Sequence, residues 1–305
     1  MKVLVTGAAG FTGRRMMEYL SAPGAPEPVG LVKRLPLGQE GDGSFIAADL
    51  LDQDSLKAAV SATCPDAVIH LAGLTQGTAE ALAAANVTGT KNLLNAAVAA
   101  NPSCRILVVS SSAVYGYAGD SPIPETAPLR PVGDYGKSKV AQEDLCRQFD
   151  MGDSAVAVVR PFNLAGPGQP DSFVCGRIVR QVNEIHDGKR DTLELREIVS
   201  SRDLVDVRDV VRGYWALVSR PDYRRDCSGK AFNLGSGMAY RVSAVIALVE
   251  EITGERYEVR LPEKPPAIPV PTQRSDNSRI TSLTGWRPEI PLKETLRDML
   301  DAARA

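Results

Sequence analysis

The sequence is poor in cysteine, and its five cysteines form no CxxC pair. They are Cys64, Cys104, Cys146, Cys175 and Cys227. An odd number of widely spaced thiols is untypical of a disulfide scaffold, and zinc sites usually need closely spaced ligand pairs. We therefore expect buried free thiols, no bound metal and a location in the reducing cytoplasm.

The sequence also lacks a surplus of one charge and a long apolar run. Its net charge is −2 and no block of like charges stands out, so nothing indicates a nucleic acid or an anionic membrane surface as partner. No window approaches the apolar length of a membrane span, and we expect no export signal. With 305 residues, of which 44% are hydrophobic, the chain is long enough for one large or two modest domains.

An apolar run interrupted by three glycines opens the chain. The glycines are Gly7, Gly10 and Gly13. Residues 3–5 are typical of a buried strand and residues 14–20 have a helical pattern, so the glycines stand in a strand-to-helix turn. Glycine there lets the backbone approach a pyrophosphate, and the helix N-terminus offers free N–H groups. The turn predicts a dinucleotide site, and a glycine-rich loop of no special purpose is the alternative.

Strand-like and helix-like segments alternate through residue 112. The strands predicted after the first are 29–32, 45–50, 66–73 and 105–110, and the predicted helices between them include 55–62 and 80–100. Parallel strands need such crossover connections, which are almost always right-handed. The sequence therefore predicts an α/β fold with a Rossmann-type, doubly wound parallel sheet.

The carboxyl ends of these strands carry the residues expected to bind the cofactor. Lys33 and Arg34 follow the second strand, where an acid binds a free ribose 2′-hydroxyl and a cation accommodates a 2′-phosphate. Two cations favour NADP(H) over NAD(H), although a solvated basic turn would have the same sequence. Asp49 is placed to accept from an adenine amino group, or to cap a helix. The other expected cofactor contacts are Phe11, Thr12, Leu50, Leu71, Ala72, Gly73, Tyr135, Lys139 and Pro161.

A tyrosine and a lysine four positions apart begin a helix predicted over 135–149. The spacing places Tyr135 and Lys139 on one face of the helix, about one turn apart. An ammonium near a phenol favours the phenolate, so Lys139 is expected to lower the pKa of Tyr135. Ser111 ends the preceding strand and is placed to hold a substrate oxygen beside that phenol. His70 lies inside an apolar run, so we expect it to be a hydrogen-bonded structural histidine.

Four motifs lie between residues 7 and 163: Gly7-x-x-Gly10-x-x-Gly13, the segment 111–116, Tyr135-x-x-x-Lys139 and Arg160-Pro-Phe-Asn163. Together they resemble the extended short-chain dehydrogenase/reductases that act on nucleotide sugars, the NAD(P)-dependent epimerase/dehydratase family. Segments 160–169, 171–174, 201–210 and 284–288 are most similar to the GDP-6-deoxy-4-keto-mannose reductases of that family.

The resemblance implies a catalytic triad of Ser111, Tyr135 and Lys139, and NADPH-dependent reduction of a nucleotide-linked 4-keto-6-deoxy sugar. It also implies a homodimer formed through 80–100 and 135–149. The implied substrate contacts are Ser111, Ser112, Asn163, Arg177, Arg202 and Arg274, with Asn163 near the diphosphate. The arginine fork suits phosphate, while surface salt bridges are the alternative for Arg177 and Arg202.

Two departures from the family pattern narrow or loosen these expectations. Dehydratases of the family place an acid pair or a Ser-Glu pair after the catalytic hydroxyl, whereas Ser112 and Ala113 follow Ser111 here. Ketone reduction therefore remains as the first hypothesis. NAD-dependent 4-epimerisation is the second, and a non-catalytic nucleotide-binding protein is the third.

The second departure is a proline-rich stretch between 261 and 273, which is predicted to form an extended edge over the site. The family has an arginine and an acid there that bind the nucleotide ribose. Arg274 and Asp276 are the candidates to replace them.

The rest of the chain predicts a smaller, interleaved lobe that binds substrate. Residues 1–160 are expected to form the NAD(P)-binding Rossmann domain, with pieces near 203–235 returning to it. Residues 161–305 are expected to form mainly the substrate-binding lobe. The predicted elements after residue 160 are helices over 173–187, 243–253 and 292–303, and a strand over 231–234 that returns to the sheet.

Overall fold

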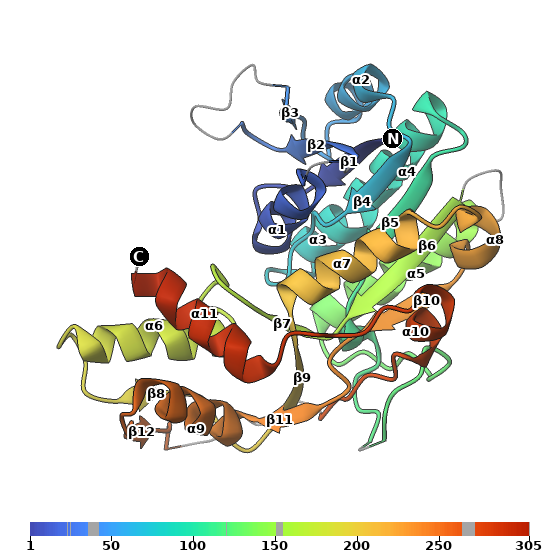
Figure 1. The fold of residues 1–305 in the computed structure, drawn as a ribbon. Helices are drawn as coiled ribbons and strands as arrows, with labels where there is room; N and C mark the ends of the chain where they lie inside the picture. Colours follow the sequence, from blue (N-terminus) through green and yellow to red (C-terminus); the bar gives the residue numbers. More distant parts are fainter. Residues whose placement is uncertain are drawn as a thin grey trace.

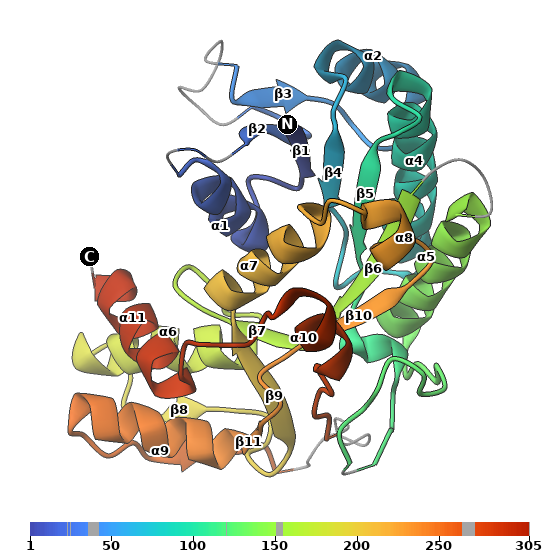
Figure 2. The same ribbon diagram turned by 45° about the vertical axis from the view of Figure 1, so that its right-hand side comes forward.

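The computed structural model describes residues 1–22, 24, 26–35, 43–119, 121–150, 155–263 and 272–304. Its centre is a sheet of seven parallel strands in the order β10-β6-β5-β4-β1-β2-β3. Helices lie on both sides of this sheet, and a smaller group of helices and short strands lies beyond its carboxyl edge (Figures 1 and 2). The strands are β1 (Lys2–Thr6), β2 (Glu27–Val32), β3 (Phe45–Ala47), β4 (Ala67–His70), β5 (Arg105–Val109), β6 (Ala155–Pro161) and β10 (Ala231–Leu234).

The two faces of the sheet are packed by different helices. Successive side chains of a strand point to opposite faces, so Val3 and Val5 enter one core while Leu4 enters the other. The first core is completed by α1 (Phe11–Leu20), α7 (Val207–Val218), α8 (Tyr223–Cys227) and α10 (Ser278–Thr284). The second core is completed by α2 (Gln53–Thr63), α4 (Gly89–Ala100) and α5 (Asp134–Asp150). The predicted doubly wound Rossmann-type fold is thereby confirmed.

A separate core lies in the smaller lobe. It is formed by α6 (Val174–His186), α9 (Val242–Thr253) and α11 (Leu292–Arg304), which pack on a three-stranded and a two-stranded sheet. The short strands are β7 (Asn163–Ala165), β9 (Ser201–Asp206) and β11 (Ala239–Arg241) in one sheet, and β8 (Leu193–Glu194) and β12 (Val259–Arg260) in the other. The chain crosses between the lobes, since β9 runs directly into α7 and β10 then pairs with β6. The exact division at residues 160 and 161 stays a prediction.

The helix predicted over 80–100 is interrupted. The structure has α3 (Ala79–Ala83), a π-helical turn (Ala84–Thr88) and then α4. The turn coincides with Asn86, which is fully buried and whose side chain bonds the backbone N–H and C=O of Leu74 at 2.8 and 2.9 Å. Single π-turns inside helices frequently occur at functional sites. Helical periodicity could not predict the turn because it depends on a contact with another segment.

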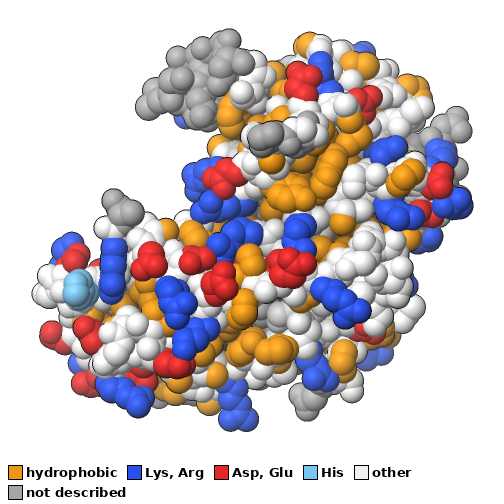
Figure 3. Space-filling model, viewed as in Figure 1, with side chains coloured by type: hydrophobic (Ala, Val, Ile, Leu, Met, Phe, Trp, Pro, Cys, Tyr) orange, Lys and Arg blue, Asp and Glu red, His pale blue; other side chains and the backbone are white. Residues whose placement is uncertain are grey.

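Both signs of charge are intermixed over the surface shown in Figure 3, as the small net charge leads one to expect. Within the described residues, no helix has the length and apolar character that crossing a membrane requires. No group of three or more potential metal ligands occurs among the same residues.

Candidate active site

The glycine turn joins β1 to α1 and leaves no room for side chains. Gly7 has a positive φ of 66°, and a Cβ there would lie 2.9 Å from the backbone nitrogen of Ala72. A Cβ on Gly13 would lie only 2.1 Å from the carbonyl oxygen of Gly7. A Cβ on Gly10 would meet only that carbonyl, at 3.1 Å, so the outer side of the turn is open. Gly10 is the N-cap of α1 and offers no side-chain cap, which leaves the first N–H groups, including those of Phe11 and Thr12, for an anion. These residues therefore fit a pyrophosphate.

The two cations after β2 differ in their surroundings. The ammonium of Lys33 pairs with the Asp49 carboxylate at 2.8 Å, and this contact lowers the pKa of Asp49. The other Asp49 oxygen accepts from the N–H of Leu51 at 3.0 Å. Arg34 is exposed beside them. In this arrangement Lys33 and Asp49 engage each other, so Arg34 is the cation better placed for a 2′-phosphate.

Other predicted cofactor residues gather where β4 and β6 end. Leu71, Ala72 and Gly73 follow β4 directly, and Pro161 is the buried last residue of β6. A Cβ on Gly73 would lie 2.7 Å from the side-chain oxygen of Asn86 and 3.7 Å from Lys139 Nζ. The bare backbone at Gly73 thus faces Lys139. Leu50, at the end of the loop after β3, packs against the start of α4, where a Cβ on Gly89 would lie 3.2 Å from its side chain.

Tyr135 and Ser111 lie next to each other at the carboxyl edge of the sheet. Ser111 follows β5, its Oγ accepts from the N–H of Ala113 at 3.1 Å, and it is also hydrogen bonded to Tyr135. Tyr135 is the second residue of α5 and is half-buried. Burial raises the pKa of Tyr135 by more than the Ser111 hydrogen bond lowers it. The structure therefore differs from the expectation of a lowered pKa: desolvation of the phenolate dominates, and the phenol keeps its proton at neutral pH.

Lys139 is buried one turn after Tyr135. Its ammonium donates to the carbonyl oxygen of Val109 and to Oε1 of Gln142, both at 2.9 Å. Burial lowers the pKa of Lys139 to about 8. The lysine is thus held by two neutral acceptors instead of by a carboxylate.

The predicted substrate residues are distributed around this centre. Asn163 donates to the Asp203 carbonyl at 3.4 Å, and the Ser112 carbonyl accepts from Gln273 at 3.1 Å. Arg177 donates to the Asp171 carbonyl at 3.2 Å, so its contact is made to its own loop. Arg202 pairs with Glu197 at 3.4 Å. The contact of Arg202 is thus an ion pair, whereas that of Arg177 is a hydrogen bond to a backbone carbonyl.

Among the described residues, Arg274 is an arginine whose Nε is buried without a hydrogen-bond partner. A buried unpaired donor is costly unless a ligand or water satisfies it. The next residue, Ser275, is fixed by the fully buried Asp203, whose Oδ2 accepts from the N–H and Oγ of Ser275 at 2.8 and 2.7 Å. The predicted extended edge over the site falls on residues 264–271, which lie outside the described residues.

Sequence reasoning missed three buried polar residues that organise the site: Asn86, Gln142 and Asp203. Asn86 donates to Ser138 Oγ at 3.0 Å, and Gln142 holds Lys139. Asp203 also accepts from the N–H and Oγ of Ser236. Asn86 and Gln142 stand inside predicted helices, where a polar residue among apolar ones is the only available signal. His70 is a structural histidine as expected: both ring nitrogens contact buried threonine hydroxyls, and burial lowers its pKa to about 3.

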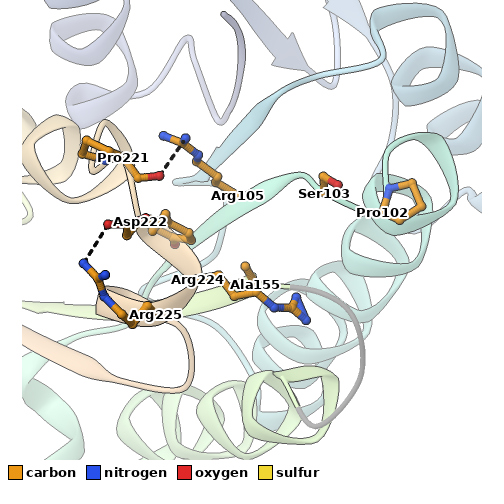
Figure 4. Close-up of a pocket in the computed structure, with 9 residues that line it drawn as sticks. Pro102, Ser103, Arg105, Ala155, Pro221, Asp222, Arg224 and Arg225 are labelled. Atoms are coloured by element: carbon orange, nitrogen blue, oxygen red, sulfur yellow. Dashed lines mark hydrogen bonds and ion pairs between the residues drawn. The ribbon is translucent and has the colours of Figure 1, made fainter.

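A pocket of about 530 Å³ lies at the opposite, amino edge of the sheet (Figure 4). It is lined by Arg105, Ala155 and the segment 221–225, and none of the predicted site residues lines it. Arg105 donates to the Val218 carbonyl at 3.0 Å and Arg225 pairs with Asp222 at 2.7 Å. These contacts hold the connection between α7 and α8.

Comparison with known proteins agrees with this arrangement. The model of the NAD dependent epimerase/dehydratase family matches residues 3–235. GDP-6-deoxy-D-mannose reductase of Pseudomonas aeruginosa is 35% identical over 98% of this chain and 96% of its own length. UDP-glucose 4-epimerase 3 of Oryza sativa subsp. japonica is 28% identical over 99% of this chain and 89% of its own. The solved structure of RMD from Pseudomonas aeruginosa complexed with NADPH superposes with a TM-score of 0.86 at 34% identity, covering 100% of this chain and 99% of that one. The chain belongs to the NAD dependent epimerase/dehydratase family.

Proposed function

We propose that the protein is an NADPH-dependent reductase of a nucleotide-linked 4-keto-6-deoxy sugar, with GDP-6-deoxy-D-mannose reductase as the relative whose activity it shares. The observation that carries the proposal is the hydrogen-bonded pair of Ser111 and Tyr135, at the same carboxyl edge of the sheet as the open glycine turn. A ketone that is reduced needs a proton donor at its oxygen, and a phenol with a raised pKa is in the donor state at neutral pH. A relative whose solved structure contains NADPH supports the choice of cofactor.

Each residue has a separate task in this proposal. Bound NADPH supplies the hydride to the carbonyl carbon. Tyr135 gives its phenolic proton to the carbonyl oxygen, and Ser111 holds that oxygen by a second hydrogen bond. Lys139 keeps a positive charge below pH 8 near the bare backbone at Gly73, where it is placed to hold the cofactor ribose. The new C–H and O–H bonds account for the hydride and the proton, and the phenolate is reprotonated from solvent.

The remaining residues bind the two ligands. Gly7, Gly10, Gly13 and the first turn of α1 hold the pyrophosphate, and Arg34 contacts the 2′-phosphate. Arg274 offers its unpaired Nε to the nucleotide sugar, together with Asn163 and Ser112. Arg177 and Arg202 are further candidates for the substrate phosphates, through guanidinium N–H groups that their present contacts with Asp171 and Glu197 do not use.

A 4-epimerase is the second candidate, because the relatives include UDP-glucose 4-epimerases. An epimerase returns the hydride to the same sugar and consumes no cofactor. Purified protein is incubated with 4-keto-6-deoxy GDP- and dTDP-sugars plus NADPH, and with UDP- and GDP-hexoses without added cofactor. We expect one mole of NADPH oxidised per mole of keto sugar. Conversion of a hexose to its 4-epimer without net NADPH oxidation would contradict the reductase.

Arg34 is expected to decide between the two nicotinamide cofactors. Arg34→Ala removes a charge-assisted contact to the 2′-phosphate and should raise the Kd for NADPH by about 10- to 100-fold, with little change for NADH. Lys33→Ala is the matched control and should have a smaller effect, because Asp49 already engages this ammonium. Both dissociation constants are measured by calorimetric titration. An equal loss for NADPH and NADH in Arg34→Ala would argue against a 2′-phosphate contact.

We also propose that the protein is a cytoplasmic homodimer whose subunits meet through residues 80–100 and 135–149. The five cysteines are free thiols in the structure, four of them buried, which suits a reducing compartment. Light scattering coupled to size-exclusion chromatography measures the oligomeric state directly.

A further inference from the structure

The buried ammonium of Lys139 has three N–H donors, and two of them are bonded within the described part of the chain. One points to the carbonyl oxygen of Val109 at the end of β5 and one to Oε1 of Gln142 on the next turn of α5. Nζ also lies 3.7 Å from the place that a Cβ on Gly73 would take. The third donor is therefore free for a group bound at the edge beside Gly73.

Gln142 is itself held on its other side. Its side chain is 1% exposed, and its amide nitrogen donates to Oγ1 of Thr90 at 2.7 Å. Thr90 lies on α4 and is fully buried. Its hydroxyl donates its own hydrogen to the backbone carbonyl oxygen of Asn86 at 2.6 Å. Thr90 Oγ1 can therefore only accept from its remaining neighbours.

The remaining hydrogen-bond neighbour of Thr90 Oγ1 is His70. Because each group has a limited number of hydrogens, the donor and the acceptor of every contact in this chain can be assigned. Nε2 of His70 lies 2.9 Å from Thr90 Oγ1 and must carry the hydrogen, because Thr90 has none left to give. Nδ1 of the neutral ring then accepts from Thr6 Oγ1 at 2.7 Å, and Thr6 in turn accepts the N–H of Ala72 at 3.1 Å. The low pKa of His70 keeps the ring in this neutral state.

This count also fixes the orientation of the Gln142 amide. A flipped amide would turn its NH₂ group toward the Lys139 ammonium and its oxygen toward a threonine with no hydrogen to donate. Both contacts would be repulsive. The oxygen of Gln142 is therefore held toward Lys139 by a chain of hydrogen bonds. This chain starts at Thr6, the last residue of β1 before the glycine turn.

We propose that Gln142 is the positioning residue of Lys139: its amide oxygen, oriented through Thr90, His70 and Thr6, holds the ammonium at the cofactor edge and supplies a neutral acceptor where a carboxylate would add a counter-charge. The inference deepens the role given to Lys139 in the proposed function and rests on it. The chain of hydrogen bonds ends at the backbone N–H of Ala72, which can only donate, so it orients the lysine and does not relay protons.

The other charged or titratable groups near Lys139 do not take over this task. Glu143 and Cys146 act on it from α5, and His70 from β4. Glu143 is already engaged by Ser110 and by two nitrogens of Arg160, and the His70 ring is neutral. The thiol of Cys146 is a weak acceptor. Among these neighbours, Gln142 is therefore the residue whose substitution should change the position and the pKa of Lys139.

The pKa of Lys139 can be measured directly, without substrate or cofactor. Lysine labelled with ¹³C at Cε is incorporated into the full chain, and Lys139→Met assigns the signal. We expect a pKa of about 8 in the unchanged protein. Gln142→Leu removes an acceptor that favours the charged form and should lower this pKa by about one unit, and Gln142→Glu should raise it by about one unit or more. Gln148→Leu and Gln148→Glu, at an exposed position of the same helix, should leave it unchanged.

Thr90 provides a second pair of variants in case a change at Gln142 impairs folding. Thr90→Ser keeps the hydroxyl and should preserve the pKa of Lys139. Thr90→Val removes the acceptor that orients the amide and should shift the pKa in the same direction as Gln142→Leu. Equal pKa values in folded Gln142→Leu, Thr90→Val and the unchanged protein would overturn the inference.

Kinetics separate the inference from the proposed function. With an active substrate, the alkaline limb of kcat/KM should follow the measured pKa of Lys139, moving down in Gln142→Leu and up in Gln142→Glu. An alkaline limb that stays fixed while the measured pKa moves would contradict a functional role for Gln142. If the unchanged protein reduces none of the candidate sugars, the proposed function fails, and the NMR titration still decides what Gln142 does to Lys139.

Discussion

Tyr135→Phe is expected to lose about 10²- to 10⁴-fold of kcat in the reduction, the range that a positioned proton donor usually contributes. The substitution removes one oxygen atom and leaves the ring in place, so the binding of NADPH should change little. The expected loss is in kcat because the proton is needed only as the carbonyl oxygen gains charge. Steady-state kinetics and a separate NADPH titration measure the two effects.

Tyr19→Phe is the matched control for this prediction. Tyr19 lies on α1 and is 36% exposed, so removing its hydroxyl should change neither kcat nor cofactor binding. If Tyr135→Phe keeps the kcat of the unchanged protein, the phenol is not the proton donor and the proposed mechanism is wrong.

Arg160→Met is expected to be the most destabilising single change among those considered, at about 3–5 kcal/mol of unfolding free energy. Arg160 donates to both carboxylate oxygens of Glu143, at 2.9 and 2.7 Å, and both side chains are at least 95% buried. Its other nitrogen donates to the hydroxyl of Tyr115 at 2.8 Å. Removal of the guanidinium leaves a buried carboxylate whose remaining partners are Ser110, which donates at 2.6 Å, and the exposed Arg147, 3.9 Å away. Urea unfolding followed by circular dichroism measures the loss.

Two further variants test whether the large loss of stability comes from the burial of the ion pair. Arg180→Met removes an exposed arginine that also has two carboxylate partners, Asp171 and Glu184, and should cost less than about 1 kcal/mol. The double variant Arg160→Met with Glu143→Leu should be less destabilised than the sum of its single changes, because no unpaired charge remains. A loss in Arg160→Met no larger than in Arg180→Met would show that the buried pair contributes little.

The pair also connects stability with the site. Ser110 precedes Ser111, Pro161 follows Arg160, and Glu143 lies one turn beyond Lys139 on α5. The ends of β5 and β6 are therefore tied to the helix that carries Tyr135. When urea weakens the contacts of Glu143 with Arg160 and Ser110, we expect activity to fall at a lower urea concentration than the one that unfolds the protein.

Several features could be predicted from the sequence alone because they depend on near neighbours. The glycine turn follows from three glycines between an apolar run and a helical pattern, and Gly7 and Gly13 indeed leave no room for a Cβ. Alternating strands and helices require a parallel sheet, since each crossover returns the chain to the same direction. The four-residue spacing of Tyr135 and Lys139 places both on one face of a helix whatever its surroundings.

Only the tertiary structure decided which partner each polar group found. Lys33 and Asp49 pair with each other, Lys139 is held by Val109 and Gln142, and burial reverses the expected direction of the pKa shift of Tyr135. Asn86 interrupts a helix to bond Leu74, twelve residues earlier. Sequence periodicity reports which face of an element is apolar. The choice among competing partners, and the desolvation that sets a pKa, depend on atoms brought together from distant parts of the chain, and so on the packed fold.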